Sequence, residues 1–235
     1  VNLNRNGLNR ERIAGLGDNP KDYDRYLDDH VAIHGELFNR VSLKLNGDPD
    51  LRGKPVEEIL EAGTGSPDPS LVELAFDAAR YNIISATGIN PPNLQGIWSG
   101  ILTPPWSGDY TTNGNLPVAI SGLLSTGTPE LMLSVFDMLE KYISDFETNA
   151  RELFDCRGIN VPSRMSSHGL NNHFDAIWPM TFWTGGAGWY SMFYYDYFLH
   201  TCDTSFLVGR TLPFMEKAVE FYEDFLISDQ GGKYI

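Results

Sequence analysis

The chain has 235 residues, enough for one large domain, and 42% of them are hydrophobic, so a sizeable core can form. Its formal net charge of −14 argues against nucleic acid and anionic membrane surfaces as partners, which leaves neutral ligands such as sugars open. No apolar run reaches the roughly 18 residues of a membrane span. Cys156 and Cys202 match no zinc-binding spacing; one disulfide between them is an alternative to two buried free thiols, which we favour.

Residues 1–21 are polar and rich in Gly and Asn, which is typical of a linker or surface segment. Neither end of the chain has the pattern of a natural terminus, so we expect a part of a longer protein. From Asp22, apolar residues at spacings of three and four predict a helix that ends before the turn at residues 46–49. The apolar stripe of this helix comprises Tyr23, Leu27, Val31, Leu37, Phe38, Val41 and Leu45.

Asp68 and Pro69 predict the start of another helix, because Asp is a good N-cap residue and Pro is favoured in the first turn. This helix is expected to stop at Gly88, and a short helical segment near residues 56–60 precedes it. Residues 88–115 then show no periodicity and contain four prolines, five glycines and two tryptophans. Long irregular loops in compact domains are uncommon and usually functional, so we predict a site in this first loop.

Thr128 and Pro129 predict the cap and first turn of a helix whose apolar face recurs regularly over residues 132–146. A second irregular loop covers residues 156–186. Residues 187–200 are apolar almost all round, which predicts a buried helix, and residues 211–226 return to one apolar face. The apolar face of residues 211–226 comprises Met215, Ala218, Val219, Tyr222, Phe225 and Leu226. Because strand-like alternation is absent, we predict an all-α chain whose inner and outer helices suit an α/α toroid.

Four of the five tryptophans lie in or beside the two irregular loops: Trp98, Trp106, Trp178 and Trp183. An indole offers a flat apolar face that suits the C–H face of a sugar ring, and it adds one N–H donor. The alternative is that these rings only fix the loops to the body of the domain. For the set as a whole we favour a carbohydrate-binding function.

Residues 109–115 (DYTTNGN) bring together several neutral hydrogen-bonding groups. If this segment is extended, Asn113 and Asn115 point the same way and can hold a water or a sugar hydroxyl between them. The alternative is a turn, because Asn-Gly is a strong turn signal, and spacing alone favours the turn. Asp109 and Tyr110 are further candidates for sugar contacts.

His168, His173 and Asp175, with Arg164 nearby, could form a polar sugar pocket, a satisfied loop network or a metal site. Their spacing is not a standard one for metal ligands, so we predict no metal and no cofactor. His30 and His34, one helical turn apart, are interpreted as structural. A glycosidase normally needs a carboxylic acid and a carboxylate base, and we identify no convincing pair in this chain.

Residues 91–98 (PPNLQGIW), 104–106 (PPW) and 109–115 closely resemble a block of glycoside hydrolase family 95, typified by 1,2-α-L-fucosidases. Further similar segments lie at residues 29–31, 37–43, 80–85, 178–180 and 185–189. The resemblance implies an (α/α)6 toroid of which residues 22–235 form about half, with a β-sandwich domain elsewhere in the protein. It also implies a secreted protein, extracellular or periplasmic.

The resemblance implies inverting hydrolysis of α-linked L-fucose or a related L-sugar in a glycan. Asn113 and Asn115 match the family's Asn-x-Asn motif, which positions and activates the attacking water, and the acid Glu and its Asp partner would fall after Ile235. The expected substrate-binding residues are Trp98, Trp106, Asp109, Tyr110, His168, His173, Asp175 and Trp178. We therefore expect residues 1–235 alone to be inactive.

Residues 116–120 and 163–167 depart from the family pattern, which weakens the inference of fucose specificity. The departures motivate an alternative, a non-catalytic carbohydrate-binding protein on the same scaffold. A phosphorylase is a third interpretation, which the acidic charge and the lack of a basic cluster near the loops disfavour. Half a toroid would expose apolar helix faces, so we expect contacts with the protein's remaining domains or with a second copy.

Overall fold

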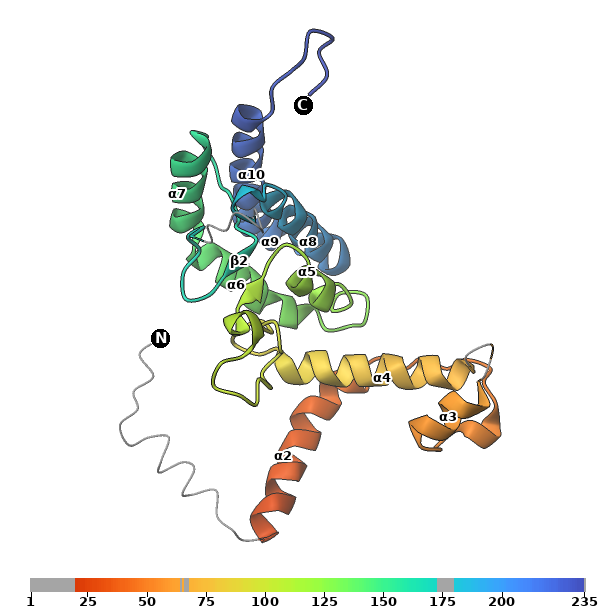
Figure 1. Cartoon of the computed structure of the whole chain (residues 1–235). Helices are drawn as coiled ribbons and strands as arrows, with labels where there is room; N and C mark the ends of the chain where they lie inside the picture. Colours follow the sequence, from red (N-terminus) through yellow and green to blue (C-terminus); the bar gives the residue numbers. More distant parts are fainter. Residues whose placement is uncertain (1–19, 64, 66–67, 173–179, 235) are drawn as a thin grey trace. The chain divides into compact units, whose positions relative to one another are not determined.

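The computed structural model describes residues 20–63, 65, 68–172 and 180–234, and the chain divides into two compact units, Val1–Ile84 and Ser85–Ile235 (Figure 1). Each unit has its own packing. Among the described residues, no helix combines the length and apolar character needed to cross a membrane.

The first unit contains α2 (Pro20–Phe38), a 3₁₀ turn (Pro49–Leu51), α3 (Val56–Ala62) and most of α4 (Pro69–Ala86). The start of α4 confirms the local prediction, because the Asp68 carboxylate accepts a hydrogen bond of 2.8 Å from the backbone N–H of Ser70. The predicted stop is confirmed as well, since α4 ends two residues before Gly88. The short helix predicted before α4 is also confirmed, because α3 lies there.

Helix α2 ends earlier than predicted, and the residue responsible lies on α4. The Arg80 Nη2 atom donates to the carbonyl oxygens of Leu37 and Phe38, at 3.0 and 3.1 Å. An arginine at a helix C-terminus satisfies the last carbonyls and interacts favourably with the helix dipole. Val41 and Leu45 therefore lie outside the helix, contrary to the prediction.

The stripe expected on α2 is also less buried than predicted, since Tyr23 is 66% and Val31 is 58% exposed. His34 is buried, and its Nε2 atom lies 3.2 Å from the carbonyl oxygen of Tyr81, while His30 stacks on its ring. In the part of the chain that the structure describes, no cluster of His, Cys, Asp or Glu side chains is arranged to hold a metal. The structural interpretation of His30 and His34 fits these contacts.

The second unit is helical, which confirms the all-α prediction, and its described strands are only two residues long. Its elements are 3₁₀ turns at Pro105–Gly108, Pro129–Met132 and Met180–Phe182, strands β1 (Tyr110–Thr111) and β2 (Arg164–Met165), helices α5 (Asn115–Ile120), α6 (Leu133–Lys141), α7 (Ile143–Phe154), α8 (Gly186–Thr201), α9 (Thr204–Phe206) and α10 (Leu212–Phe225), and a π-helical turn (Leu207–Thr211) between the last two. Helix α5 was not predicted from the sequence.

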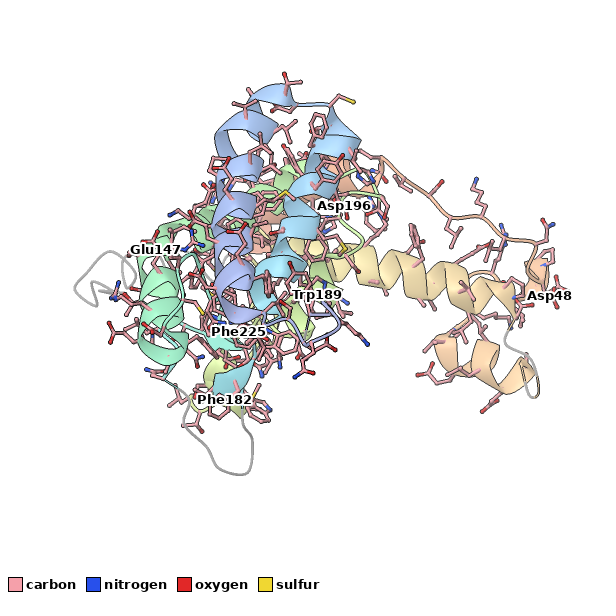
Figure 2. All side chains as sticks on the ribbon, turned by 90° about the horizontal axis from the view of Figure 1, so that it is seen from above. Asp48, Glu147, Phe182, Trp189, Asp196 and Phe225 are labelled. Carbon is pink, nitrogen blue, oxygen red and sulfur yellow. The ribbon has the colours of Figure 1, made fainter. Side chains whose placement is uncertain are left out.

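An aromatic core joins three helices of this unit. The ring of Tyr194 on α8 lies 4.2 Å from Phe136 on α6 and 4.4 Å from Phe214 on α10, measured between centroids. Helices α8 and α10 run side by side, with the labelled Trp189 and Asp196 on α8 and Phe225 at the end of α10 (Figure 2). The apolar face predicted for α10 is partly wrong, because Val219 is 53% exposed while Phe214 and Phe221 are buried.

The helix predicted through residues 132–146 is interrupted at Tyr142, whose backbone has φ −110° and ψ 16°. The second irregular loop passes this point closely, since a Cβ atom on Gly169 would lie 2.8 Å from Tyr142 Cβ and 3.0 Å from Phe146 Cδ1. Thr128 does not cap the helix as predicted. Its hydroxyl donates instead to the carbonyl oxygen of Leu123, at 3.0 Å.

Both cysteines are free thiols, as predicted, but only Cys156 is buried. Cys202 is exposed, which corrects the expectation of two buried thiols. It ends α8 in a left-handed conformation with φ 56°, a position at a helix end that faces solvent. Burial raises the pKa of the Cys156 thiol.

Candidate functional site

The two irregular loops are joined by the short antiparallel pair β1–β2. Tyr110 pairs with Met165 and Thr111 pairs with Arg164. The ladder continues beyond the strands, because the backbone N–H groups of Thr112 and Asn113 both donate to the carbonyl oxygen of Ser163, at 2.9 and 3.3 Å. This register places the polar segment of the first loop against residue 164 of the second.

A buried asparagine anchors the second loop to α7. The Asn149 Nδ2 atom donates to the carbonyl oxygens of Asn160 and Gly169, at 3.1 and 2.8 Å. Its Oδ1 atom accepts from the backbone N–H of Asn171, at 2.8 Å. These three hydrogen bonds are buried, so they hold the loop residues 160, 169 and 171 against α7.

The joined loops form a solvent-open cavity of about 250 Å³, lined by Leu94, Trp106, Thr111, Asn113, Asn115, Arg164 and Met180. Asn113 lies in a turn and Asn115 is the first residue of α5, so the extended arrangement was wrong and the turn was right. Both amides nevertheless line the same cavity, because the turn leads directly into the helix.

Asp109 is buried, and its carboxylate is already paired with neighbouring groups. It forms an ion pair with Arg164 Nε and accepts a hydrogen bond of 2.8 Å from Thr111 Oγ1. Arg164 also donates from Nη2 to the carbonyl oxygen of Trp106, at 2.9 Å, and its guanidinium carbon lies 4.9 Å from the centre of the Trp106 ring. Asp109 is not among the residues that line the cavity.

Three further predicted sugar contacts lie outside the cavity lining: Trp98, Tyr110 and His168. Trp98 is 53% exposed and covers Gly96, where a Cβ atom would lie 2.8 Å from the indole ring. Tyr110 is half-buried, and burial raises the pKa of its phenol. The His168 Nδ1 atom accepts from the backbone N–H of Leu170 at 3.2 Å, which fits the satisfied loop network.

The predicted residues His173, Asp175 and Trp178 lie outside the described residues. Sequence reasoning missed Leu94, Thr111 and Met180 as lining residues, and it noted Arg164 only as a neighbour of the histidines. For Thr111 the sequence contained a partial signal, because this residue belongs to the polar segment at residues 109–115. Leu94 and Met180 carry no such signal, because isolated apolar residues in a loop are common.

The cavity offers amide groups, a hydroxyl and an indole, all neutral, together with a guanidinium that is already paired with Asp109. Such groups suit the hydroxyls and the apolar faces of a sugar. No carboxylate belongs to the lining found among the described residues. The cavity can therefore orient a neutral polar ligand.

The sequence of residues 22–235 matches the model of the glycosyl hydrolase family 95 catalytic domain. The chain belongs to glycosyl hydrolase family 95. Relatives of this family 95 chain include Alpha-L-fucosidase 2 of Arabidopsis thaliana, 29% identical over 86% of the chain and 25% of that protein. Probable alpha-fucosidase A of Aspergillus niger is 28% identical over 97% of the chain and 31% of that protein. The protein of the same description from Aspergillus oryzae is 35% identical over 48% of the chain.

The family 95 chain therefore spans less than a third of the length of each of these relatives, from 16% to 31%. The match covers both irregular loops and the helices that hold them. All-α architecture is what the family resemblance implied.

Proposed function

We propose that the protein to which this chain belongs is an inverting glycoside hydrolase that acts on α-linked L-fucose or a related L-sugar in a glycan. One observation carries the proposal: the amides of Asn113 and Asn115 line the same cavity as the indole of Trp106. Family membership and the alpha-fucosidase relatives support the reaction class.

In the proposed reaction, the two amides hold a water molecule at the anomeric carbon, each through either its carbonyl oxygen or its NH₂ group. A carboxylate base takes the proton of that water as its oxygen attacks, while a carboxylic acid protonates the departing glycosidic oxygen. Inverting enzymes hold these two groups roughly 6.5–9.5 Å apart, which leaves room for the water. We place the acid and base beyond residue 235, as the family resemblance implies, and the described cavity lining contains no carboxylate.

The test uses the full-length protein with an aryl α-L-fucoside and a fucosylated oligosaccharide. We expect turnover whose first sugar product has the inverted anomeric configuration, observed by proton NMR. Asn113→Ala and Asn115→Ala should each lower kcat about 100-fold or more with a smaller change in KM, because the water loses its orientation. The matched control is Asn90→Ala, an exposed residue of the first loop outside the cavity lining, which should leave both parameters unchanged. Retention of configuration would exclude the proposed mechanism.

A second candidate is a non-catalytic carbohydrate-binding protein. The engagement of Asp109 with Arg164 favours it, because this leaves no free carboxylate at the described cavity. Calorimetry with L-fucose and fucosylated oligosaccharides decides between the two. Binding that Trp106→Ala weakens, without release of sugar from any substrate, would favour the binding protein, whereas turnover that requires inorganic phosphate would indicate a phosphorylase.

An extracellular or periplasmic location is the last part of this proposal, and it rests on the family resemblance. Fractionation of the source cells, followed by immunodetection of the full-length protein, tests it. Recovery with the cytoplasmic fraction alone would contradict it.

A further inference from the structure

The segment that carries Trp106 has an unusual backbone. Trp106, Ser107 and Gly108 follow one another with φ of 55°, 59° and 60°. Left-handed conformations are readily accessible to glycine, whereas a residue with a side chain adopts them only at an energetic cost. Two such residues in succession persist only where surrounding contacts hold them.

Arg164 supplies two of these contacts from the second loop. One side of its guanidinium group donates to the Trp106 carbonyl oxygen, at 2.9 Å, and the group lies over the indole ring of the same residue, 4.9 Å from its centre. The Arg164 side chain is only 13% exposed, whereas Trp106 is 50% exposed, so the arginine is the buried partner and the indole stays accessible. On the first loop itself, Gln95 Nε2 donates to the Pro105 carbonyl oxygen, at 3.0 Å.

Asp109 in turn fixes the orientation of Arg164. Its carboxylate pairs with the Nε atom, which leaves Nη2 free to point at Trp106, and Thr111 Oγ1 holds the other carboxylate oxygen at 2.8 Å. Thr111 and Arg164 are partners in the β1–β2 register. The four residues therefore form one connected unit across the two loops, and only Asp109 of the four is withdrawn from the cavity lining.

We propose that Arg164 is a positioning residue: oriented by Asp109, it holds the indole of Trp106 at the cavity as the stacking platform for a neutral sugar ring. This rests on the proposed function, since it assigns the contact through which that site takes its substrate. Asp109 then acts through Arg164 and does not touch the sugar. The arrangement needs the planar guanidinium, because a lysine has a single charged nitrogen and cannot serve the carboxylate, the carbonyl and the ring face together.

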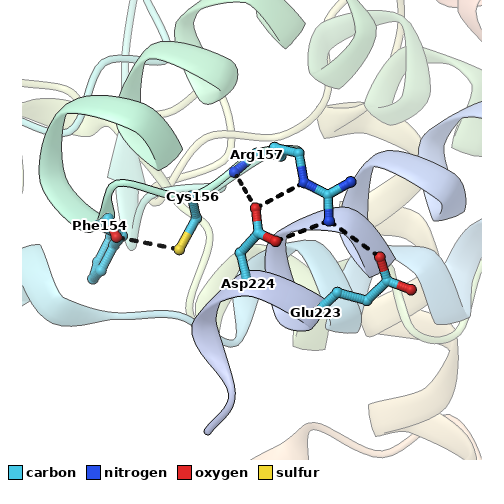
Figure 3. A network of polar contacts seen from close by, with 5 residues as sticks. All are labelled: Phe154, Cys156, Arg157, Glu223 and Asp224. Atoms are coloured by element: carbon cyan, nitrogen blue, oxygen red, sulfur yellow. Dashed lines mark hydrogen bonds and ion pairs between the residues drawn. The ribbon is translucent and has the colours of Figure 1, made fainter.

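The test is a double-mutant cycle in the full-length protein with Arg164→Lys, Trp106→Phe and the double variant. If Arg164 acts through Trp106, each single variant should raise KM about tenfold with kcat changed less than about twofold, and the double variant should resemble Trp106→Phe. Arg157→Lys is the matched control, because Arg157 also joins a loop to a distant carboxylate but lies outside the cavity lining (Figure 3).

A second measurement needs no substrate. In protein labelled with 5-fluorotryptophan, the ¹⁹F resonance that disappears in Trp106→Phe identifies Trp106. That resonance should shift or broaden in Arg164→Lys and in Asp109→Asn, and it should stay in place in Arg157→Lys.

Three outcomes would overturn the inference, and each is distinguishable from failure of the proposed function. Effects of Arg164→Lys and Trp106→Phe that multiply in the double variant would mean that Arg164 acts independently of Trp106. An active Trp106→Phe variant with an unchanged KM would show that Trp106 is not the stacking platform for the sugar. A Trp106 resonance that stays in place in Arg164→Lys would show that Arg164 does not position the indole. Absence of both turnover and sugar binding in the wild-type protein would instead refute the proposed function.

Discussion

Asp224 on α10 is held by a single arginine from the second loop. Its carboxylate accepts hydrogen bonds from the Arg157 backbone N–H, Nε and Nη2, at 2.9, 2.9 and 2.8 Å (Figure 3). These bonds favour the charged form and lower the pKa of Asp224 from 3.8 to about 2. Because the folded pKa lies below the unfolded value, the carboxylate contributes stability above pH 3.8, which is lost as the pH falls toward about 2.

We expect Asp224→Asn to remove this acid-dependent contribution, so that urea midpoints fall less steeply between pH 4 and pH 2 than in the wild type. Urea denaturation at each pH measures the effect. Asp50→Asn is the charge-matched control, because the Asp50 side chain is exposed and forms no ion pair among the described residues. An equally steep acid limb in Asp224→Asn and the wild type would show that the Arg157 contacts are not maintained in solution.

At the residue scale, Asn113 and Asn115 were predicted from the sequence and both line the described cavity, but their geometry did not follow from the sequence. The Asn-Gly dipeptide indicated a turn, and the turn is present, whereas the position of Asn115 at the start of α5 depended on a helix that had no local signal. The pairing of Asp109 with Arg164 joins residues 55 positions apart. No spacing rule encodes such a contact, because it follows from the register in which two loops meet.

At the scale of elements, Gly158 lets the second loop approach α10. Its φ is +67°, and a Cβ atom there would lie 2.6 Å from the backbone N of Phe221 and would collide with the Lys217 carbonyl oxygen. That oxygen accepts the backbone hydrogen bond of Ile159, at 3.1 Å. We expect Gly158→Ala to lower the free energy of unfolding by at least about 2 kcal/mol, measured by urea denaturation.

The control for this substitution is Gly209→Ala in the π-helical turn. A Cβ atom at Gly209 meets no atom within 4 Å, and its φ is not positive. Alanine at this position should be neutral or stabilise the protein by up to about 1 kcal/mol, because it restricts the unfolded chain. Equal effects of the two substitutions would mean that the loop does not pack against α10 as described.

Asp203 begins the helical stretch that leads into α10. Its Oδ1 atom accepts from the Ser205 hydroxyl at 2.6 Å and from the backbone N–H groups of Ser205 and Phe206, at 2.9 and 3.0 Å. These bonds, the hydroxyl's first among them, lower the pKa of Asp203. We expect Asp203→Ala to cost about 1 kcal/mol of stability and Asp203→Asn to cost only a few tenths, since asparagine caps equally well. Thermal unfolding of both variants measures this, and equal losses would exclude capping as the cause.

Helix positions were predictable where the start and stop signals are local, and they were not where a distant residue ends the helix. Helix α4 begins after Asp68 and ends before Gly88, as those residues indicate. Helix α2 ends where Arg80 reaches its last carbonyls, and the interruption at Tyr142 lies where Gly169 passes. Neither Arg80 nor Gly169 has a pattern that identifies the helix it acts on.

At the scale of the whole molecule, the all-α class followed from helical periodicity, and family membership followed from the motifs of the first loop. The toroid itself is a property of the family. The chain aligns with only 25% of the length of the Arabidopsis relative and 31% of the length of the Aspergillus niger relative. The lining of the described cavity contains amides, a hydroxyl and an indole, and its guanidinium is paired with Asp109, but no carboxylate belongs to it.

We therefore expect residues 1–235, expressed alone, to release no sugar from an aryl α-L-fucoside under conditions in which the full-length protein is active. The physical reason is that amides orient a water but cannot take its proton or protonate the leaving oxygen near neutral pH. Circular dichroism and size-exclusion chromatography verify that the fragment is folded, and fluorescence titration with L-fucose verifies its cavity. Turnover by the folded fragment, abolished by Asn113→Ala, would place the acid and base within residues 1–235. Asp175 would then be the first carboxylate to substitute.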